Sequence, residues 1–322
     1  MDASIPETMT AAAINRFGGP DVLELRTLPV PIPKPDEVLI RLQSAGIGVW
    51  DPWVREGRLA LGDSGTFPRV IGNDGAGVVV ASGQDARRFR RGDLVYAFSP
   101  AGGFYAEYVA VKEEDVAPLP RAMTPREAGA LGADGITALR GLDDALRLEP
   151  AEALMIFGAS GGIGHLAVQL ARRMGARVLA VASGPDGVDL VQRLGADAAI
   201  DGRRDDVGSA AQAFAADGLD AALVLASGDR LGAGLSEMRP RGRVAFPNGV
   251  EPRPRARPDV TLIPYDGLPD REAFERLNLL IGDEPFHIEL GHIYRLEDAA
   301  LAHAHIGDHH LGKLAFAIGP SS

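Results

Sequence analysis

The stretch LMIFGASGGIGHLAVQLARRMGARVLAVAS, residues 154–183, decides how the middle of this chain folds. It begins with a short apolar run at 154–157, of the kind that forms a buried parallel strand. Glycines follow at 158, 161, 162 and 164, and apolar residues then recur at helical spacing through 174. Gly175 ends this helix pattern, and a second apolar run follows at 178–182. The pattern predicts a strand, a glycine turn, a helix and a second strand.

A glycine turn of this kind brings backbone N–H groups to a helix start, where the helix dipole favours negative charge. Spaced glycines alone are weak evidence in a chain that contains 40 of them. The flanking strands and the helix supply the structural context that the motif requires. We therefore predict a dinucleotide site in which Ser160, Gly161, Gly162 and Ile163 contact the pyrophosphate through their backbone. A purely structural βαβ turn is the alternative.

The end of the second strand indicates which dinucleotide is preferred. Sites for NAD usually place Asp or Glu there to accept from the ribose 2′-hydroxyl, and this strand ends with Ala182-Ser183-Gly184. Ser183 leaves room for a 2′-phosphate, and we predict that it contacts that phosphate and that the cofactor is NADPH. Asp186 could still curl back towards the ribose. Arg203 and Arg204 are further candidates for phosphate contact, unless they belong to a solvated loop.

Composition limits the classes of protein to which this chain can belong. A length of 322 residues accommodates two domains, and 46% hydrophobic and 24% charged residues are typical of a soluble globular protein. The net charge of −11 argues against a nucleic-acid or anionic-membrane partner. No apolar run is long enough to span a membrane, and the opening MDASIPETMT does not resemble a secretory signal. The chain has no cysteine, which fits a cytoplasmic location and excludes disulfides and thiolate metal sites.

The order of patterns along the chain predicts two domains. Short strand-like runs at 22–28, 37–43, 75–81, 93–97 and 105–111 predict an antiparallel, barrel-like β domain. A helix start at Thr124-Pro125-Arg126-Glu127 opens a region in which strands at 154–157, 178–182, 198–200, 220–226 and 243–247 alternate with helices, as in a doubly wound parallel sheet. The tail returns to the first style, with strands near 287–295 and 313–318 around a helix at 297–305. The predicted fold is α/β, with a first domain of residues 1–124 and 285–322 and a second domain of residues 125–284.

These pieces, in this order, resemble the medium-chain dehydrogenase/reductase superfamily, in its zinc-independent quinone oxidoreductase branch. The similar motifs are, in order, Phe17-Gly18-Gly19-Pro20; Ala45 to Asp51 with Arg55 and Gly57; Phe67-Pro68 with Gly72 to Val79; Gly92-Asp93-Leu94-Val95; Gly103 to Tyr108; Gly158 to Gly164; and Gly312-Lys313. The resemblance implies a GroES-like β-barrel catalytic domain and a Rossmann NADP-binding domain. It also implies a homodimer formed through the edge of the nucleotide-domain sheet.

The zinc ligands of other members of that superfamily are missing here. Where zinc-dependent members carry a cysteine this chain has Gly48, and where they carry Gly-His-Glu it has Gly72-Asn73-Asp74. Because catalytic zinc needs three protein ligands of N, S or O type, we predict no metal site. The resemblance then implies hydride transfer from NADPH to a quinone or an α,β-unsaturated carbonyl. One alternative is an enoyl reductase of a biosynthetic pathway, and another is an NADPH-binding regulatory or structural protein with little turnover.

The resemblance also assigns roles to residues outside the glycine turn. Thr137, in the segment 135–138, is expected near the nicotinamide as a catalytic residue. Asn248 and Gly249 are expected in a loop that crosses the nicotinamide end of the cofactor. Lys313 is expected near the cofactor entrance, in contact with phosphate, and a surface lysine on a strand edge is the alternative.

The segment after Gly48 supplies the remaining candidates. Asp51 is a candidate catalytic residue that could orient a ribose hydroxyl or Arg55, and a plain ion pair is the alternative. Trp53 stands where many quinone reductases carry a tyrosine, and with Trp50 it could present indoles to a flat acceptor. Either tryptophan could instead pack a domain interface.

Four histidines near the end of the chain, at 303, 305, 309 and 310, could suggest a metal. Their spacing places the side chains on different helix faces, so we interpret them as helix-end caps.

Overall fold

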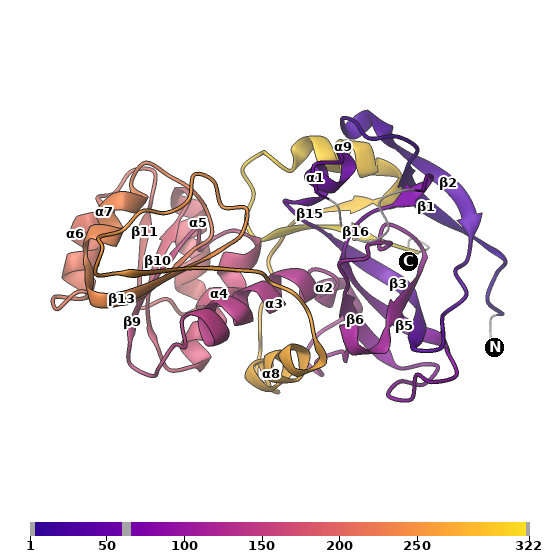
Figure 1. Cartoon of the computed structure of the whole chain (residues 1–322), viewed down its shortest axis with the longest axis horizontal. Coiled ribbons are helices and arrows are strands. Elements are labelled where there is room, and N and C mark those ends of the chain that lie inside the picture. The colour runs from indigo at the N-terminus through magenta and orange to yellow at the C-terminus, as the bar shows by residue number, and fades with distance from the viewer. Residues whose placement is uncertain (1–3, 60–65, 320–322) are drawn as a thin grey trace. The chain divides into compact units, whose positions relative to one another are not determined.

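The structure is a computed structural model that describes residues 4–59 and 66–319 (Figure 1). The chain divides into two compact units. Unit 1 consists of Met1–Ala133, Pro269–Glu275 and Leu290–Ser322, and unit 2 consists of Asp134–Leu268 and Arg276–Glu289. The outermost ends of the first predicted domain, residues 1–3 and 320–322, lie outside the described residues. The first and last unit boundaries lie nine and five residues further along the chain than the predicted domain boundaries, and residues 269–275 of the predicted second domain belong to unit 1. The domain boundaries stay predictions.

Unit 2 contains a parallel sheet with the strand order β11-β10-β9-β12-β13-β14 among the described residues. The strands are β9 (Ala153–Phe157), β10 (Arg177–Ala182), β11 (Ala198–Asp201), β12 (Leu219–Val224), β13 (Met238–Pro247) and β14 (Thr261–Tyr265). All residues of β9 are buried, as the continuous apolar run predicts for a central parallel strand. The predicted doubly wound parallel pattern is therefore confirmed.

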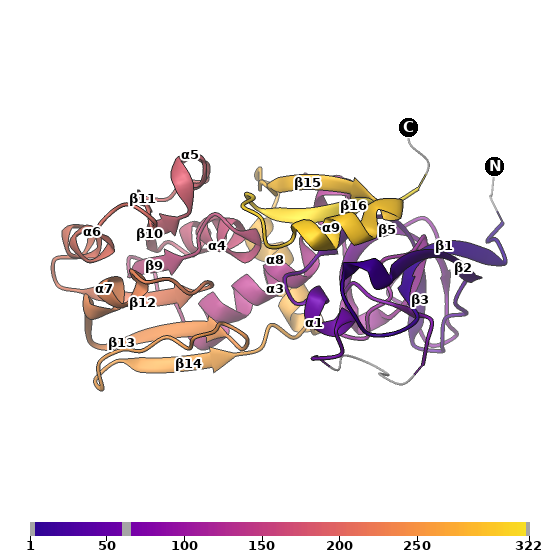
Figure 2. The ribbon, with the colours of Figure 1, turned by 90° about the horizontal axis from the view of Figure 1, so that it is seen from above.

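Four helices of the described residues connect strands of this sheet: α4 (Gly162–Arg173), α5 (Gly184–Arg193), α6 (Val207–Phe214) and α7 (Leu231–Ser236). Helix α3 (Gly132–Leu139) precedes β9, and α8 (Arg271–Ile281) follows β14. The helix α4 begins and ends where the apolar spacing and Gly175 place it. Strand β14 has no counterpart in the predicted elements, and Figure 2 shows it beside β13. Its Pro264 is compatible with its place at the end of the sheet, because an end strand needs fewer backbone N–H donors.

Unit 1 is built mainly from antiparallel strands. Its larger sheet has the order β15-β16-β3-β5-β6-β8, with β7 also paired to β3, and a smaller sheet has the order β2-β1-β4, as far as the described residues show. The strands are β1 (Thr8–Ile14), β2 (Leu23–Pro29), β3 (Glu37–Ile47), β4 (Arg69–Val70), β5 (Asp74–Ser82), β6 (Leu94–Phe98), β7 (Tyr108–Lys112), β8 (Val116–Pro118), β15 (Leu290–Arg295) and β16 (Lys313–Ala317). The tail joins this sheet because β16 pairs antiparallel with β3. The order of the larger sheet begins at β15 and ends at β8, so the barrel-like prediction corresponds to an open strand order.

Short helices complete unit 1. They are α1 (Asp51–Arg55), α2 (Pro125–Ala128) and α9 (Ala299–His305). The predicted helix start at Thr124 is confirmed, because its hydroxyl accepts from the Glu127 N–H and the Glu127 carboxylate accepts from the Thr124 N–H. Among the residues that the structure describes, no helix combines the length and apolar character needed to cross a membrane.

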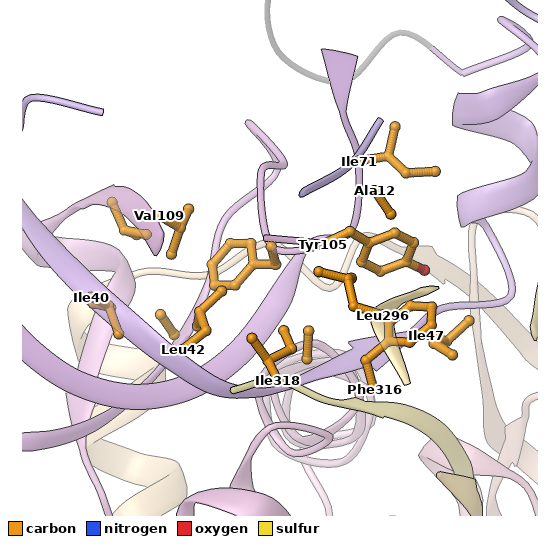
Figure 3. Close-up of a cluster of buried hydrophobic side chains, with 14 of the residues drawn as sticks. Ala12, Ile40, Leu42, Ile47, Ile71, Tyr105, Val109, Leu296, Phe316 and Ile318 are labelled. Atoms are coloured by element: carbon orange, nitrogen blue, oxygen red, sulfur yellow. The ribbon is translucent and has the colours of Figure 1, made fainter. Parts of the chain in front are cut away.

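The core of unit 1 includes Tyr105, an aromatic side chain whose polar end matters for the site. Figure 3 shows Tyr105 among apolar side chains that include Ile47 and Phe316, with its hydroxyl oxygen at one side of the cluster. The Tyr105 and Phe316 rings meet edge to face at 4.7 Å between centroids. Tyr105 is completely buried, so its hydroxyl requires a partner inside the protein.

Candidate functional site

The glycine turn of unit 2 connects β9 to α4. Gly158 has a φ of +88°, a conformation that side chains disfavour, and it turns the chain away from the strand. Gly161 is the N-cap of α4 and has no side chain to occupy the free N–H groups of the first helical turn. Gly164 lies against the turn, since a Cβ built on it would overlap the Gly158 carbonyl oxygen and lie 2.7 Å from Ala159 Cα. The turn thus exposes backbone donors at a helix N-terminus and fits a diphosphate.

Ser160 after β9 and Asp201 at the end of β11 bind the backbone of the loop that follows β10. Ser160 is buried, and its hydroxyl accepts from the Ser183 N–H at 3.1 Å. Ser183 precedes α5, and its own hydroxyl makes no capping bond to that helix. The Asp201 carboxylate accepts from the Gly184 N–H at 3.1 Å and from the Arg203 N–H at 3.0 Å. Asp201 was not among the predicted site residues, and it anchors the loop in which Ser183 lies.

The predicted cofactor residues of unit 2, apart from Thr137, lie at the carboxyl-terminal ends of the strands of the parallel sheet. The turn at 158–163, Ser183 and the pair Asn248 and Gly249 all follow the carboxyl ends of parallel strands, where ligands bind in open α/β sheets. The Asn248 side chain donates to Asp266 at 2.9 Å, and both Asn248 and Gly249 are exposed. Thr137 lies on α3 instead and is buried, with its carbonyl oxygen accepting from the Tyr265 hydroxyl at 3.0 Å.

In unit 1, an indole occupies the space in front of the missing zinc ligand. A Cβ built on Gly48 would lie 2.8 Å from Cε2 and 3.0 Å from Nε1 of Trp50. A cysteine or asparagine at position 48 would therefore collide with this ring. Asn73 is also committed elsewhere, since its buried amide donates to the Ser99 carbonyl at 3.0 Å. Within residues 4–59 and 66–319, no cluster of three or more His, Cys, Asp or Glu side chains could hold a metal ion.

Lys313 forms a buried ion pair beside this indole. Its ammonium group lies 2.8 Å from Asp74 Oδ2, and both side chains are only 2% exposed. The same oxygen accepts from the Ala133 N–H at 3.0 Å, and the Lys313 ammonium lies 6.0 Å from the centroid of the Trp50 ring. The alternative of a surface lysine on a strand edge is wrong, because β16 lies between β15 and β3. Contact between Lys313 and a cofactor phosphate stays a prediction.

Asp51 belongs to a second buried network. Its Oδ2 atom accepts from the Gly48 N–H at 2.7 Å and from the Tyr105 hydroxyl at 2.6 Å. The Tyr105 oxygen lies 3.2 Å from His303 Nε2, and His303 Nδ1 lies 3.0 Å from the Arg55 guanidinium. Because arginine can only donate, His303 Nδ1 accepts and its Nε2–H donates to Tyr105. Hydrogen bonds therefore run in one direction from Arg55 through His303 and Tyr105 to Asp51.

Burial determines which members of this network are charged. Burial raises the pKa of Asp51 to about 7, against the opposing hydrogen bonds from Tyr105 and Gly48. Burial and the neighbouring Arg55 lower the pKa of His303 to about 3, so its imidazole is neutral. Burial also raises the pKa of Tyr105 well above its ordinary value. Since Oδ2 already accepts two hydrogen bonds and Oδ1 has no partner among the described residues, the carboxyl proton belongs on Oδ1.

Two expectations for this region are corrected. Asp51 does not pair with Arg55, whose guanidinium instead contacts Glu56 at 2.8 Å, the Gly18 carbonyl at 2.9 Å and His303. His303 is not an exposed helix-end cap, since it is 4% exposed and bonded within the network. Trp53, two residues after Asp51, is half-buried, with the Arg58 guanidinium 5.8 Å from its ring centroid.

Asp51→Asn should remove a loss of stability that wild type shows as pH rises from about 4 to about 7. Because the folded-state pKa of Asp51 is raised from 3.8 to about 7, its contribution to stability is complete below pH 3.8 and is lost as pH rises through 7. Relative to wild type, the variant should gain about 1.4 kcal/mol of unfolding free energy per pH unit across this window. Urea unfolding of both proteins at several pH values measures this difference. A difference that does not change with pH would contradict the assignment.

Several residues of the two networks were not predicted. Tyr105 and Asp74 lie in motifs noted for the resemblance, but nothing in those motifs marks them as partners of Asp51 and Lys313. His303 is 198 positions from Tyr105 and 248 positions from Arg55, so local spacing carries no signal for these contacts. Only pairs of positions that vary together among related sequences would have indicated these contacts.

Comparisons with known proteins give consistent matches. Residues 34–121 match the family model described as alcohol dehydrogenase GroES-like domain, and residues 162–252 match the one described as zinc-binding dehydrogenase. The quinone oxidoreductase of Lama guanicoe is 31% identical over 238 residues, which cover 73% of this chain and 72% of that protein. The quinone oxidoreductase of Mus musculus is 29% identical over 322 residues, covering 95% of this chain and 97% of that protein.

A solved structure extends the similarity to three dimensions. A mycobacterial protein complexed with NADPH has a TM-score of 0.84 and 25% sequence identity, and the match covers 96% of this chain and 100% of that one. These comparisons confirm the predicted fold class, a GroES-like domain together with a parallel-sheet Rossmann domain.

Proposed function

This chain belongs to the medium-chain dehydrogenase/reductase superfamily, in its quinone oxidoreductase-like branch, and from that premise we propose that it transfers a hydride from NADPH to a quinone or an α,β-unsaturated carbonyl without zinc. The chain is an oxidoreductase that uses a nicotinamide dinucleotide. The observation that carries the proposal is the turn between β9 and α4, where Gly158, Gly161 and Gly164 leave backbone donors free at a helix start.

The residues of that turn would hold the cofactor. Gly162 and Ile163 are half-buried and begin α4, so their N–H groups would bind the pyrophosphate. The N–H of the N-cap Gly161 donates to the Gly158 carbonyl at 3.3 Å, so Gly161 would contact the pyrophosphate only if that bond is shared. The buried Ser160 hydroxyl holds the neighbouring loop by accepting from the Ser183 N–H. Asn248 and Gly249 lie at the same ends of the strands and would line the nicotinamide end. When bound, the cofactor supplies the hydride, and the protein positions and polarises the acceptor.

The tryptophans near Gly48, where a zinc ligand is missing, favour an acceptor that can be reduced without a Lewis acid. A quinone or enone is already an electrophile, so it requires a flat binding surface and a proton rather than a metal. The Trp50 indole covers Gly48, and half-buried Trp53 lies on the helix that follows. We propose that these indoles present a surface to a flat conjugated acceptor.

Asp51 would be the source of the proton that the acceptor gains on reduction. Reduction adds one hydride and one proton to the acceptor, so the proton must come from a group that still carries it near neutral pH. Asp51 still holds its proton near neutral pH, since burial raises its pKa to about 7. Because Asp51 is only 1% exposed and its Oδ1 is buried without a partner within the described chain, a water molecule would have to carry the proton from Oδ1 to the acceptor. After the proton leaves, the hydrogen bonds from Tyr105 and Gly48 stabilise the carboxylate, and water restores the proton.

The proposed function is tested by titrating the purified protein with NADPH and NADH, followed by turnover assays. The acceptors are a benzoquinone, a naphthoquinone, an enone and an enoyl thioester, and loss of reduced-nicotinamide absorbance is measured. NADPH oxidation with a quinone or the enone supports the proposal. Oxidation with the enoyl thioester alone favours a biosynthetic enoyl reductase. Tight binding without turnover favours a regulatory role, and absence of binding overturns the proposal.

Ser183→Asp should reverse the preference between the two cofactors. A carboxylate at the end of β10 repels a 2′-phosphate and accepts from a 2′-hydroxyl. We expect the Kd for NADPH to rise about 30-fold and the Kd for NADH to fall, a change of about 2 kcal/mol for NADPH. Fluorescence titration measures both constants.

The matched control is Ser183→Ala, which removes the hydroxyl without adding charge and should weaken NADPH binding only about threefold. If Ser183→Asp binds NADPH as tightly as wild type does, Ser183 is not at the 2′-phosphate.

A small-molecule acceptor, a homodimer and a cytoplasmic location complete the proposed description. The homodimer is tested by light scattering of the purified chain.

A further inference from the structure

One face of α4 carries three polar side chains that bind the backbone of a distant segment. His165, Gln169 and Arg173 are spaced four residues apart and therefore lie along the same side of the helix. Each of them has a partner in the segment 280–289, more than a hundred residues further along the chain. We call these three side chains the α4 stripe. Helix α4 is the helix that starts at the glycine turn (Figure 1).

The lower part of the stripe holds the segment through carbonyl and amide groups. The Gln169 amide donates to the His287 carbonyl at 2.8 Å and accepts from the His287 N–H at 2.9 Å. The Arg173 guanidinium donates to the carbonyls of Leu280, Ile281, Glu284 and Pro285. Arg173 also lies 5.1 Å from the centroid of the Phe286 ring. The segment 280–287 is thus bonded along the helix.

His165, at the upper end of the stripe, has one partner at each ring nitrogen. The Glu289 N–H lies 3.1 Å from Nε2, and because a backbone amide can only donate, Nε2 is the acceptor. The proton therefore sits on Nδ1, which donates to the Gly161 carbonyl at 2.9 Å. Burial lowers the pKa of His165 to about 4. Of the ionisable groups that face it, His287 lowers this pKa further and Glu289 raises it. The imidazole therefore stays neutral, in this tautomer, at physiological pH.

One of these two bonds lies at the glycine turn, and the other lies at the last residue of unit 2. The Gly161 carbonyl and the Gly162 N–H belong to one planar trans peptide and point in opposite directions, so holding the carbonyl also orients an N–H at the start of α4. The other bond holds Glu289, and the chain passes from unit 2 to unit 1 between Glu289 and Leu290. One buried imidazole therefore connects the glycine turn to Glu289, the last residue of unit 2.

We propose that His165 is a positioning residue that couples dinucleotide binding at the glycine turn to the order of the segment 287–289. The inference rests on the proposed dinucleotide site and extends it to regulation of that segment. A ligand that orders the Gly161–Gly162 peptide stabilises the imidazole, and the imidazole stabilises Glu289. Because such coupling is reciprocal, loosening the segment must weaken dinucleotide binding by the same factor.

Two substitutions separate the two bonds of His165. His165→Asn keeps a donor near the Nδ1 position and loses the acceptor for Glu289. His165→Gln keeps an acceptor near the Nε2 position and loses the side-chain donor to the Gly161 carbonyl, which still accepts from the backbone N–H of residue 165 at 3.1 Å. We measure Kd for NADPH by fluorescence titration and amide hydrogen exchange of residues 286–291 with and without NADPH.

In wild type, saturating NADPH should slow exchange of the Glu289 amide about fivefold, and His165→Asn should abolish this response. His165→Gln should raise the Kd for NADPH about tenfold, the value of one hydrogen bond of about 1.4 kcal/mol. Arg173→Leu is the matched control: it loosens 280–285 from the same helix but touches neither the turn nor Glu289, so both readouts should stay at wild-type values.

Three results are decisive. Variants of His165 that bind NADPH with the wild-type Kd and show the wild-type exchange response overturn the coupling and leave the proposed function intact. An equal loss of both readouts in Arg173→Leu also overturns it, because the effect would then reflect general stability. Wild-type protein that binds neither NADPH nor NADH overturns the proposed function, and the coupling with it.

Discussion

Replacing Gly164 with alanine should raise the Kd for NADPH at least about 100-fold and lower the free energy of unfolding by about 3 kcal/mol. The added Cβ would overlap the Gly158 carbonyl oxygen and lie 2.7 Å from the carbonyl carbon and Cα of Ala159. These are backbone atoms, so the collision cannot be relieved by a side-chain rotation. Either the turn or the start of α4 must move, and both supply the N–H groups proposed to bind the pyrophosphate. Fluorescence titration and urea unfolding measure the two effects.

Two other glycines provide controls for this variant. A Cβ on Gly161 would lie 3.6 Å from the Gly158 oxygen, an ordinary contact, so Gly161→Ala should fold normally while weakening NADPH binding at the turn. A Cβ on Gly232, in α7, meets nothing within 4 Å, so Gly232→Ala should be neutral or slightly stabilising. If Gly164→Ala behaves like Gly232→Ala in both assays, the close approach of α4 to the turn is not a requirement of the fold or the site.

Lys313→Met should be the most destabilising single substitution of a charged residue in unit 1. The variant leaves the Asp74 carboxylate, 2% exposed, without its ammonium partner at 2.8 Å. Breaking a buried ion pair by removing one partner costs about 3–5 kcal/mol, because an uncompensated charge stays in the protein interior. Urea unfolding at neutral pH measures the loss. The second variant Asp74→Asn, added to Lys313→Met, should recover a large part of it because no charge is then buried.

An exposed pair provides the contrast. Lys112 lies 3.4 Å from Glu114 with both side chains more than half exposed, so Lys112→Met should cost far less stability than Lys313→Met. A loss of similar size in Lys313→Met and Lys112→Met would show that burial of the Asp74–Lys313 pair does not contribute to stability. The four unfolding energies of wild type, the two single variants at 74 and 313 and their double variant give the coupling between Asp74 and Lys313 directly.

Local pattern was sufficient for the nucleotide-binding unit up to its last strand. The strands β9, β10 and β11 and the helix α4 form where apolar runs and glycines place them, because each is specified by neighbours within one element. Strand β14 was not predicted, because Pro264 interrupts a short apolar run and a proline at such a position is typical of a loop. Only the pairing of β13 with β14 makes that segment a strand, and pairing depends on a partner more than ten residues away.

The candidate site divides in the same way. By itself, the sequence determined the glycine turn, the absence of a carboxylate at Ser183 and the loss of the zinc ligand at Gly48, since each is a property of one residue in a local motif. The tertiary structure alone decided that Asp51 meets Tyr105 and that Asp74 meets Lys313. It also decided that His165 joins the turn to Glu289.

The physical reason is that these contacts join residues far apart in the chain. Asp74 and Lys313 are 239 positions apart, and Tyr105 and His303 are 198 positions apart. Backbone periodicity extends over a few turns or strands and says nothing about which buried polar group another will meet. Burial then sets the protonation of Asp51 and His303, because the cost of removing charge from water depends on the surrounding atoms rather than on the sequence neighbours.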